Sequence, residues 1–279
     1  MEKFLSELEQ TSILIKSRIS GNLTGNYKSS ALGNSYDFYG IRPYYEGDSI
    51  RNVDWKAFAR SEKIYTKLFT EQKQINVSVL LDSSKSMDFG KPTKWYIGKM
   101  CAIGLSYITL KEVNKLNLYS FNENIELNLN NLNSKKLFYE VIKNIESIKP
   151  QGETNLKDII SKTNSSKGIL FIITDLLSEN IEVFLKNSKG KYEKVVLIHI
   201  MSEEEVNPSI KGKIKFIDSE TGEEKIGDIG EKEIDIYKKK VKEYIKECKY
   251  ECEKRGIRYI FAQDFNSPVQ IIMKAIEVE

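Results

Sequence analysis

Short, strongly apolar runs recur along the chain, and each is followed directly by a polar residue. Residues 75–81 lead to Asp82, residues 168–174 lead to Asp175, and residues 194–201 form a third run. Unbroken runs of this kind predict strands that are covered on both faces, as in a parallel sheet. Helical periodicity lies between and after them, over residues 92–113, 134–148, 179–188, 231–255 and 268–276. This alternation predicts a doubly wound sheet with helices on both faces.

Four other segments complete the predicted sheet and its surroundings. Residues 115–121 and 125–129 flank a short Asn-Glu-Asn turn, which favours an antiparallel pair of strands. Residues 210–229 predict a hairpin, and residues 259–262 predict a last strand. We therefore expect a three-layer α/β/α domain whose sheet is mainly parallel.

The first part of the chain shows a different pattern. Residues 2–19 have a loose apolar face that predicts an amphipathic helix. Residues 33–73 are rich in aromatic side chains and in opposite charges, and they lack a clean period. We expect short strands and turns there, with a strand over residues 63–70, where apolar and polar residues alternate.

We therefore divide the chain into two predicted regions. Residues 1–73 would form an N-terminal helix with a charged aromatic segment, and residues 74–279 would form the α/β domain. Arginines that pair with carboxylates beside Trp55 would hold this segment against the domain, as a structural clasp. A binding surface in the same segment is the alternative interpretation.

Composition narrows the classes of function. The chain has 279 residues and a net charge of +3, which gives no reason to expect binding to nucleic acid or anionic lipid. No apolar stretch reaches the roughly 20 residues that a membrane-spanning helix needs. The acidic, interrupted start is unlike a signal peptide, so we expect a cytoplasmic protein. Cys248 and Cys252 share a predicted helix face without a nearby histidine, which favours packing over metal binding.

Oxygen-bearing side chains follow the apolar runs. Asp82 is followed by Ser84 and Ser86, Thr154 lies in the polar loop 151–155, and Asp175 follows the second run. In a doubly wound sheet these loops lie at the carboxyl edge, where ligands bind. Carboxylate and hydroxyl oxygens suit a hard divalent cation such as Mg²⁺ or Mn²⁺.

These residues carry a resemblance to a known family. Asp82-x-Ser84-x-Ser86, Thr154 and Asp175 resemble the metal-ion-dependent adhesion site of von Willebrand factor type A domains. The earlier segment resembles the hallmark of the bacterial domain-of-unknown-function 58 (DUF58) family, through Gly40, Arg42, Tyr44, Gly47, Asp48, Arg51, Asp54, Trp55, Ala59 and Arg60. The first resemblance covers residues 74–279, and the second covers the segment before them.

The resemblance implies a function as well as a fold. Ser84, Ser86 and Thr154 would be direct or near-direct ligands of Mg²⁺ or Mn²⁺, whereas Asp82 and Asp175 would act largely through water. A glutamate or aspartate of a partner would complete the metal's coordination. The resemblance also implies that the chain works with a MoxR-type AAA+ ATPase, or with a client protein, in protein assembly or activation.

Two other functions stay open at this stage. One is a metal-dependent hydrolase. An aspartate-based phosphatase would need a second aspartate two positions after Asp82, where Ser84 stands. A Ser-His-Asp hydrolase would have to use the only histidine, His199, which lies within an apolar run. No phosphate-binding loop of the P-loop type is present. The second alternative is a vestigial metal site on a scaffold that interacts through residues 33–73.

Overall fold

The computed structural model describes residues 1–10, 37–70, 74–112, 114–164, 167–210, 212–217 and 224–277. These residues divide into two compact units. Residues 37–70 lie in the smaller unit, and residues 1–10 lie with the residues from 75 onwards in the larger one. Each unit is described by itself.

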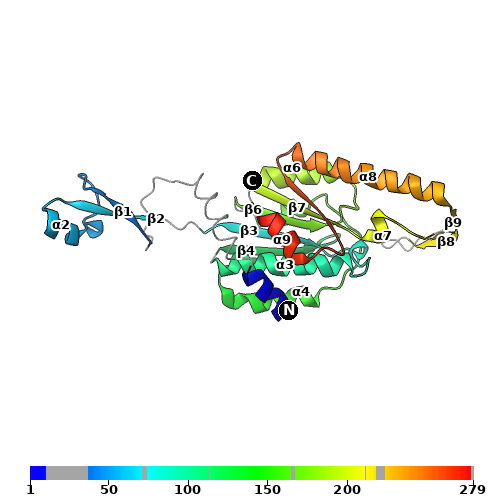
Figure 1. Ribbon diagram of the computed structural model, residues 1–279, viewed down its shortest axis with the longest axis horizontal. Coiled ribbons are helices and arrows are strands. Elements are labelled where there is room, and N and C mark those ends of the chain that lie inside the picture. The colour runs from blue at the N-terminus through cyan, green and yellow to red at the C-terminus, as the bar shows by residue number, and fades with distance from the viewer. Residues whose placement is uncertain are drawn as a thin grey trace. The chain divides into compact units, whose positions relative to one another are not determined.

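A six-stranded sheet forms the centre of the larger unit (Figure 1). Its strands, in spatial order, are β10 (Arg258–Gln263), β7 (Lys194–Met201), β6 (Ile169–Thr174), β3 (Asn76–Asp82), β4 (Lys115–Phe121) and β5 (Ile125–Leu132). All neighbouring strands are parallel except β5, which runs antiparallel to β4. The predicted α/β fold with a mainly parallel sheet is therefore confirmed, including the antiparallel pair.

Helices cover both faces of this sheet and give three layers. One face packs against α3 (Lys94–Lys111), α4 (Phe138–Ser147) and α9 (Pro268–Ile276), and the other packs against α5 (Ile159–Lys162), α6 (Ile181–Lys191) and α8 (Glu231–Glu253). Alternation along β3 explains why its apolar run is unbroken. Val79 and Leu81 belong to the first core and Leu80 to the second, so both faces of the strand are covered.

The described part of the first helix, residues 2–10, also belongs to the larger unit. Leu8 is fully buried in the core beside α3, and Glu9 accepts a hydrogen bond from the Tyr107 hydroxyl of that helix. The sequence predicts that this helix belongs with residues 33–73, whereas in the structure it packs against α3. The remainder of the predicted helix, residues 11–19, lies outside the described residues.

A short helix and a hairpin lie between β7 and α8. Helix α7 (Glu203–Val206) begins immediately after β7, and β8 (Gly212–Ile217) pairs antiparallel with β9 (Glu224–Ile229). This confirms the hairpin predicted over residues 210–229. Within the described ranges, no helix is both long enough and apolar enough to span a bilayer.

The smaller unit is built on an antiparallel pair of strands, β1 (Asp37–Pro43) and β2 (Tyr65–Thr70). The 3-10 helix η1 (Ile50–Asn52) and helix α2 (Trp55–Ser61) connect them. Asp48 fixes the turn, because it pairs with Arg42 at 2.7 Å and accepts hydrogen bonds from the Tyr45 amide and the Thr66 hydroxyl.

Sequence reasoning expected short strands and turns in this segment. The strand over residues 63–70 is confirmed as β2, but α2 was not predicted, because its amphipathic pattern is too short to stand out from the surrounding charges. Asp54 caps this helix by accepting from the amides of Lys56 and Ala57. Residues 33–36 and 71–73 of the predicted segment lie outside the described residues.

Candidate metal site at the carboxyl edge of the sheet

Asp82 is the last residue of β3, and its side chain is fully buried. One carboxylate oxygen, Oδ1, accepts a hydrogen bond from the Ser84 amide at 2.9 Å. The other, Oδ2, accepts one from the Thr174 hydroxyl of the neighbouring strand β6 at 2.6 Å. Both oxygens are therefore held in fixed directions by the backbone turn and by the adjacent strand.

Ser84 and Ser86 lie in the turn that follows Asp82. The 3-10 helix η2 (Lys85–Met87) brings both hydroxyls to the same side of the turn, and their Oγ atoms are 3.0 Å apart. Both residues are buried. The spacing of two residues thus produces the pair of neighbouring hydroxyls that the sequence predicts.

Thr154 lies in a loop that is hydrogen-bonded to the other two loops of the site. The Lys85 amide donates to the Gly152 carbonyl, and the Ser178 hydroxyl donates to the Thr154 carbonyl, both at 2.9 Å. Thr154 is itself almost entirely buried, at 9% exposure. The structure therefore brings together the three loops that carry the five predicted residues.

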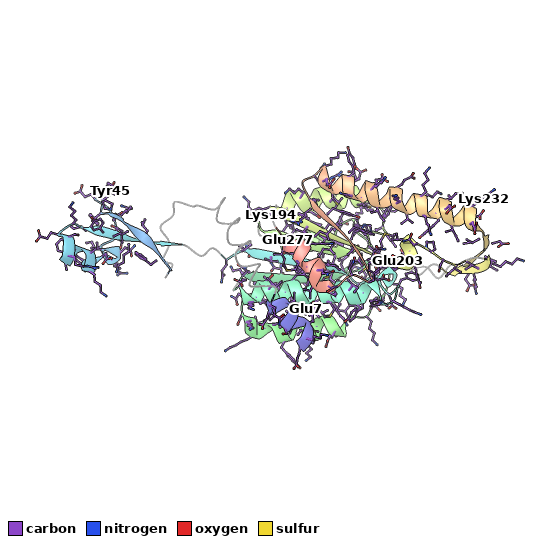
Figure 2. The ribbon with its side chains drawn as sticks, in the orientation of Figure 1. Glu7, Tyr45, Lys194, Glu203, Lys232 and Glu277 are labelled. Atoms are coloured by element: carbon purple, nitrogen blue, oxygen red, sulfur yellow. The ribbon has the colours of Figure 1, made fainter. Side chains whose placement is uncertain are left out.

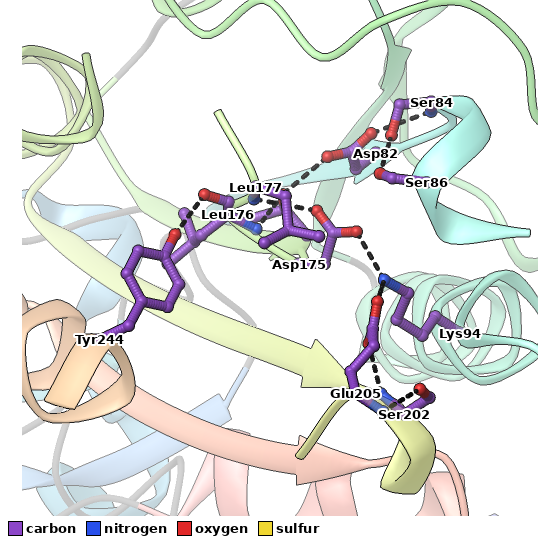
Figure 3. Close-up of polar contacts among 11 residues, drawn as sticks. Asp82, Ser84, Ser86, Lys94, Asp175, Leu176, Leu177, Ser202, Glu205 and Tyr244 are labelled. Carbon is purple, nitrogen blue, oxygen red and sulfur yellow. Dashed lines mark hydrogen bonds and ion pairs between the residues drawn. The ribbon is translucent and has the colours of Figure 1, made fainter. Parts of the chain in front are cut away.

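Asp175 follows β6 and is fully buried. Its Oδ1 accepts a hydrogen bond from the Leu177 amide at 3.1 Å. Leu176, between them, has a φ of +56°, which is unfavourable for a leucine. Two hydrogen bonds hold this conformation: the Leu176 amide donates to the Thr174 hydroxyl, and the Tyr244 hydroxyl of α8 donates to the Leu176 carbonyl (Figure 3).

Lys94 is a residue of the site that sequence reasoning missed. It is the first residue of α3, is completely buried, and donates from Nζ to Asp175 Oδ2 at 2.8 Å and to Glu205 Oε1 at 2.5 Å. Figure 3 shows its ammonium between these two carboxylates. The available signal was a lysine in the first turn of the helix predicted over residues 92–113, where the helix dipole disfavours a cation.

Burial and neighbouring charges shift the pKa values of Asp82 and Lys94. Burial raises the pKa of Asp82 to about 7, and the neighbouring Asp175 carboxylate raises it too, while hydrogen bonds from Thr174 and Ser84 oppose the shift. Burial opposes the charge on Lys94, but the carboxylates of Asp175 and Glu205 outweigh it and raise the pKa of the ammonium. Among the described residues, Asp175 forms an ion pair with Lys94, whereas none forms one with Asp82.

His199 lies in the middle of β7, as its apolar surroundings predict, and is fully buried. Its Nδ1 is 2.6 Å from the Tyr259 hydroxyl, and its Nε2 is the one buried side-chain nitrogen or oxygen without a hydrogen bond in the described part of the chain. Burial lowers the pKa of His199 to about 4, so the ring is neutral at pH 7. The histidine is thus a core residue with no access to solvent.

The residues present fit a hard divalent cation. Two buried carboxylates and neighbouring hydroxyls offer only oxygen atoms, and each carboxylate keeps further lone pairs beyond the hydrogen bonds it accepts. Within the described ranges, no group of three or more His, Cys, Asp or Glu side chains could hold a metal ion. The candidate site therefore depends on two carboxylates together with hydroxyl oxygens, and not on three such side chains.

Relatives of this chain occur in mycobacteria. The uncharacterized protein Rv1480 of Mycobacterium tuberculosis (strain ATCC 25618 / H37Rv) is 20% identical over 230 residues, which cover 79% of this chain and 72% of the relative. The uncharacterized protein Mb1516 of Mycobacterium bovis matches with the same identity and coverage.

Several solved structures are similar at low sequence identity. An aerotolerance-related membrane protein from Bacteroides fragilis NCTC 9343 matches with a TM-score of 0.47 and 16% identity, over 72% of this chain and 98% of the other. The conserved hypothetical protein BatB from Bacteroides thetaiotaomicron matches with a TM-score of 0.43 and 16% identity, over 73% and 100%. The SpRpn10 VWA domain matches with a TM-score of 0.40 and 11% identity, over 72% and 94%.

One protein family matches most of the chain. The match covers residues 40–247, and it begins at Gly40, the first residue of the glycine, arginine and aspartate motif of the smaller unit. It continues through β3, the serine pair and β6. The chain therefore belongs to the family described as Protein of unknown function DUF58.

Proposed function

We propose that this chain is a non-enzymatic protein-interaction module that docks an acidic side chain of a partner through Mg²⁺ or Mn²⁺. The observation that carries the proposal is the pair of buried aspartates, Asp82 and Asp175, beside two hydroxyls 3.0 Å apart at the carboxyl edge of the sheet. Burying two carboxylates together is unfavourable unless a cation compensates their charge. Lys94 supplies one positive charge, so part of the negative charge of the two aspartates is left for a bound cation to compensate.

The chain's own residues would divide the work of holding the ion. Ser84, Ser86 and Thr154 offer neutral oxygen ligands, and the two aspartates offer negative charge. A divalent cation bound there would supply positive charge that can accept a carboxylate from outside. The hydrogen bonds to Asp82 from Ser84 and Thr174 keep that carboxylate oriented before the ion arrives.

The structure offers little support for a hydrolase. His199 is sealed in the core and its pKa is lowered to about 4, so it is a weak base without access to a substrate at this edge. The Ser84 hydroxyl lies 3.0 Å from the Ser86 hydroxyl, and a second hydroxyl cannot act as its base at neutral pH. We therefore favour binding over turnover.

The family resemblance suggests the partner. We propose a MoxR-type AAA+ ATPase or a client protein, reached through a glutamate or aspartate on its surface, in the cytoplasm. A site in the smaller unit is the second candidate, because Tyr45 and Trp55 are 64% and 58% exposed there and exposed aromatic side chains are enriched at interfaces. Partner capture that persists in EDTA would favour that candidate.

The proposal is tested by titrating the full chain with Mn²⁺ and Mg²⁺ in a calorimeter. We expect saturable binding by the wild type and a loss of affinity of roughly 10–100-fold for Ser84→Ala, since one ligand is removed. Ser83→Ala is the matched control, because that hydroxyl bonds to Phe121, Ser120 and Glu126 on the neighbouring strands. Absence of binding by the wild type, or equal affinities for both variants, would contradict the proposal.

Activity assays distinguish the docking function from the alternative, a metal-dependent hydrolase. The wild type is incubated with phosphoester and carboxylic ester substrates in Mg²⁺, and we expect no turnover. Hydrolysis that disappears in Asp82→Ala would replace the docking function with a metal-dependent hydrolase.

A further inference from the structure

A buried chain of charges extends from the candidate metal site to helix α7. Asp175 accepts from Lys94, and Lys94 also donates to Glu205, which lies 111 residues further along the sequence than the lysine. The side-chain exposures of Lys94 and Asp175 are both 0%, and that of Glu205 is 16%. The ammonium is thus shared between one residue of the candidate metal site and one residue outside it.

The position of Lys94 makes its charge dependent on these two partners. It occupies the first residue of α3, where the helix dipole repels a cation. It is also withdrawn from water, and among the described residues the two carboxylates that accept from its Nζ compensate the loss of hydration. Weakening either carboxylate contact must strengthen the dependence of Lys94 on the other.

Glu205 is held in place by local structure. Ser202 and Glu205 form a capping box at the start of α7: the Glu205 amide donates to the Ser202 hydroxyl at 3.1 Å, and the Ser202 amide donates to Glu205 Oε2 at 2.7 Å. The remaining oxygen, Oε1, faces Lys94. The capping box therefore fixes the distance between the Glu205 carboxylate and the ammonium.

We propose that Lys94 is an internal cation that competes with the divalent ion for Asp175. Glu205 increases the metal affinity because its carboxylate compensates part of the positive charge of Lys94. The inference rests on the proposed function, since it concerns the same cation site. Lys94 and Glu205 are positioning residues here and not metal ligands.

The electrostatic argument gives opposite signs for the two residues. A fixed positive charge beside Asp175 repels a divalent cation and occupies one of the lone pairs that the cation or its water would use. The Glu205 carboxylate attracts the divalent cation. It also accepts a hydrogen bond from the Lys94 ammonium, which weakens the interaction of that ammonium with Asp175. Removing Glu205 therefore leaves Asp175 as the acceptor of the Lys94 ammonium and should weaken metal binding. Removing Lys94 leaves the Asp175 carboxylate available to the metal and should strengthen binding.

The test measures Mn²⁺ affinity by electron paramagnetic resonance on the full chain and on four variants. We expect Glu205→Gln to bind Mn²⁺ roughly 10-fold more weakly than the wild type, an effect typical of residues just outside a metal's ligands. Lys94→Met should bind it more tightly. The double variant should recover at least the wild-type affinity, because the lysine whose charge Glu205 moderates is then absent.

Glu204→Gln is the matched control, since this exposed residue lies on the same helix and loses the same charge. Its affinity should stay within about twofold of the wild type, as expected for a screened surface charge. Thermal unfolding without metal checks that each variant folds. If Lys94→Met does not fold, the comparison of Glu205→Gln with Glu204→Gln decides, and equal affinities overturn the inference.

The outcomes distinguish the two proposals. No Mn²⁺ binding by the wild type would overturn the proposed function itself. Binding by the wild type, together with equal or same-direction changes in Glu205→Gln and Lys94→Met, would leave the docking function standing and overturn the competition between Lys94 and the metal. A purely structural role for the pair predicts losses of affinity in both variants.

Discussion

Asp82 combines a stabilising hydrogen-bond set with an unfavourable charge. Burial and the nearby Asp175 raise the pKa of Asp82 to about 7 in the folded chain, whereas an aspartate in an unfolded chain titrates near 4. The folded state therefore holds a proton between these values that the unfolded state has lost. The stability that this proton contributes is complete below pH 4 and is lost as the pH rises through 7.

Asp82→Asn should remove this pH dependence. In EDTA at pH 8 we expect the variant to be more stable than the wild type by on the order of 2–4 kcal/mol, because a neutral amide replaces a buried, uncompensated carboxylate. At pH 4 the two proteins should differ little, since Asp82 is protonated there. Denaturant unfolding at both pH values measures the difference.

The same substitution separates Asp82 from His199. Burial lowers the pKa of His199 to about 4, so the histidine contributes stability above pH 6.5 that is lost as the pH falls towards 4. This trend runs opposite to that of Asp82 over much of the same range. His199 is unchanged in Asp82→Asn, so the difference between the two proteins reports on Asp82 alone, and a difference that does not grow with pH would contradict the assignment.

Helix α3 packs against several other elements of the larger unit. It contacts the sheet, α4, α9 and the first helix, and its first residue is the lysine of the site. Gly104 lies where these helices approach, because a Cβ at this position would come within 2.4 Å of Ile272 and 3.1 Å of Leu8. Ile272 and Leu8 are fully buried, so neither can move aside freely.

Gly104→Ala should therefore destabilise the chain. Overpacking of a core typically costs about 1–3 kcal/mol, and the gain in helix propensity from glycine to alanine returns at most about 1 kcal/mol. We expect a net loss of about 1 kcal/mol in denaturant unfolding. Gly190→Ala in α6 is the control, because a Cβ there meets nothing within 4 Å and should stabilise the chain slightly. The same sign for both substitutions would show that helix propensity, and not packing, decides.

The elements that sequence could predict are those with a strong local pattern. Strands β3, β6 and β7 appear as apolar runs because both their faces are covered, and α9 lies at the predicted residues 268–276. The residues from Leu156 onwards also predict a helix, but α5 begins only at Ile159, because the preceding residues form the loop that carries Thr154. Local pattern does not show where a loop must stay irregular to position a side chain.

Lys94 shows the other limit of sequence reasoning. Its two carboxylate partners are 81 and 111 residues away along the chain, so no local periodicity or short motif relates them to it. The five predicted residues could be grouped because the edge of a parallel sheet is known to gather the ends of its strands. No such rule predicts that a lysine at the start of a helix, such as Lys94, will reach the same edge as a counter-ion.

At the scale of the whole molecule, the carboxyl edge of the sheet gathers parts that are distant in sequence. The loops after β3 and β6 and the loop that carries Thr154 are hydrogen-bonded to one another, and Tyr244 connects α8 to the second of them. Figure 2 shows Glu203 and Lys232 on the α7 and α8 elements that follow β7. An ion bound at this edge should therefore stabilise the folded larger unit as a whole.

Mg²⁺ should raise the melting temperature of the wild type, and the size of the shift should depend on pH. A ligand that binds only the folded state stabilises it by RT ln(1 + [L]/Kd), about 2.7 kcal/mol when its concentration is 100 times Kd. Because Asp82 has a pKa of about 7, protons compete with the ion below that value. We expect a clear shift at pH 8 and little or none at pH 5.

Asp82→Asn supplies the control for this linkage. The variant should already be stabilised at pH 8 without metal, and Mg²⁺ should add little, because the charge that attracts the ion is absent. The wild type with Mg²⁺ and the variant without it would then be stabilised for the same physical reason, which is that the buried Asp82 charge has been compensated or removed. A Mg²⁺ shift of equal size at pH 5 and pH 8, or an undiminished shift in the variant, would place the ion elsewhere on the molecule.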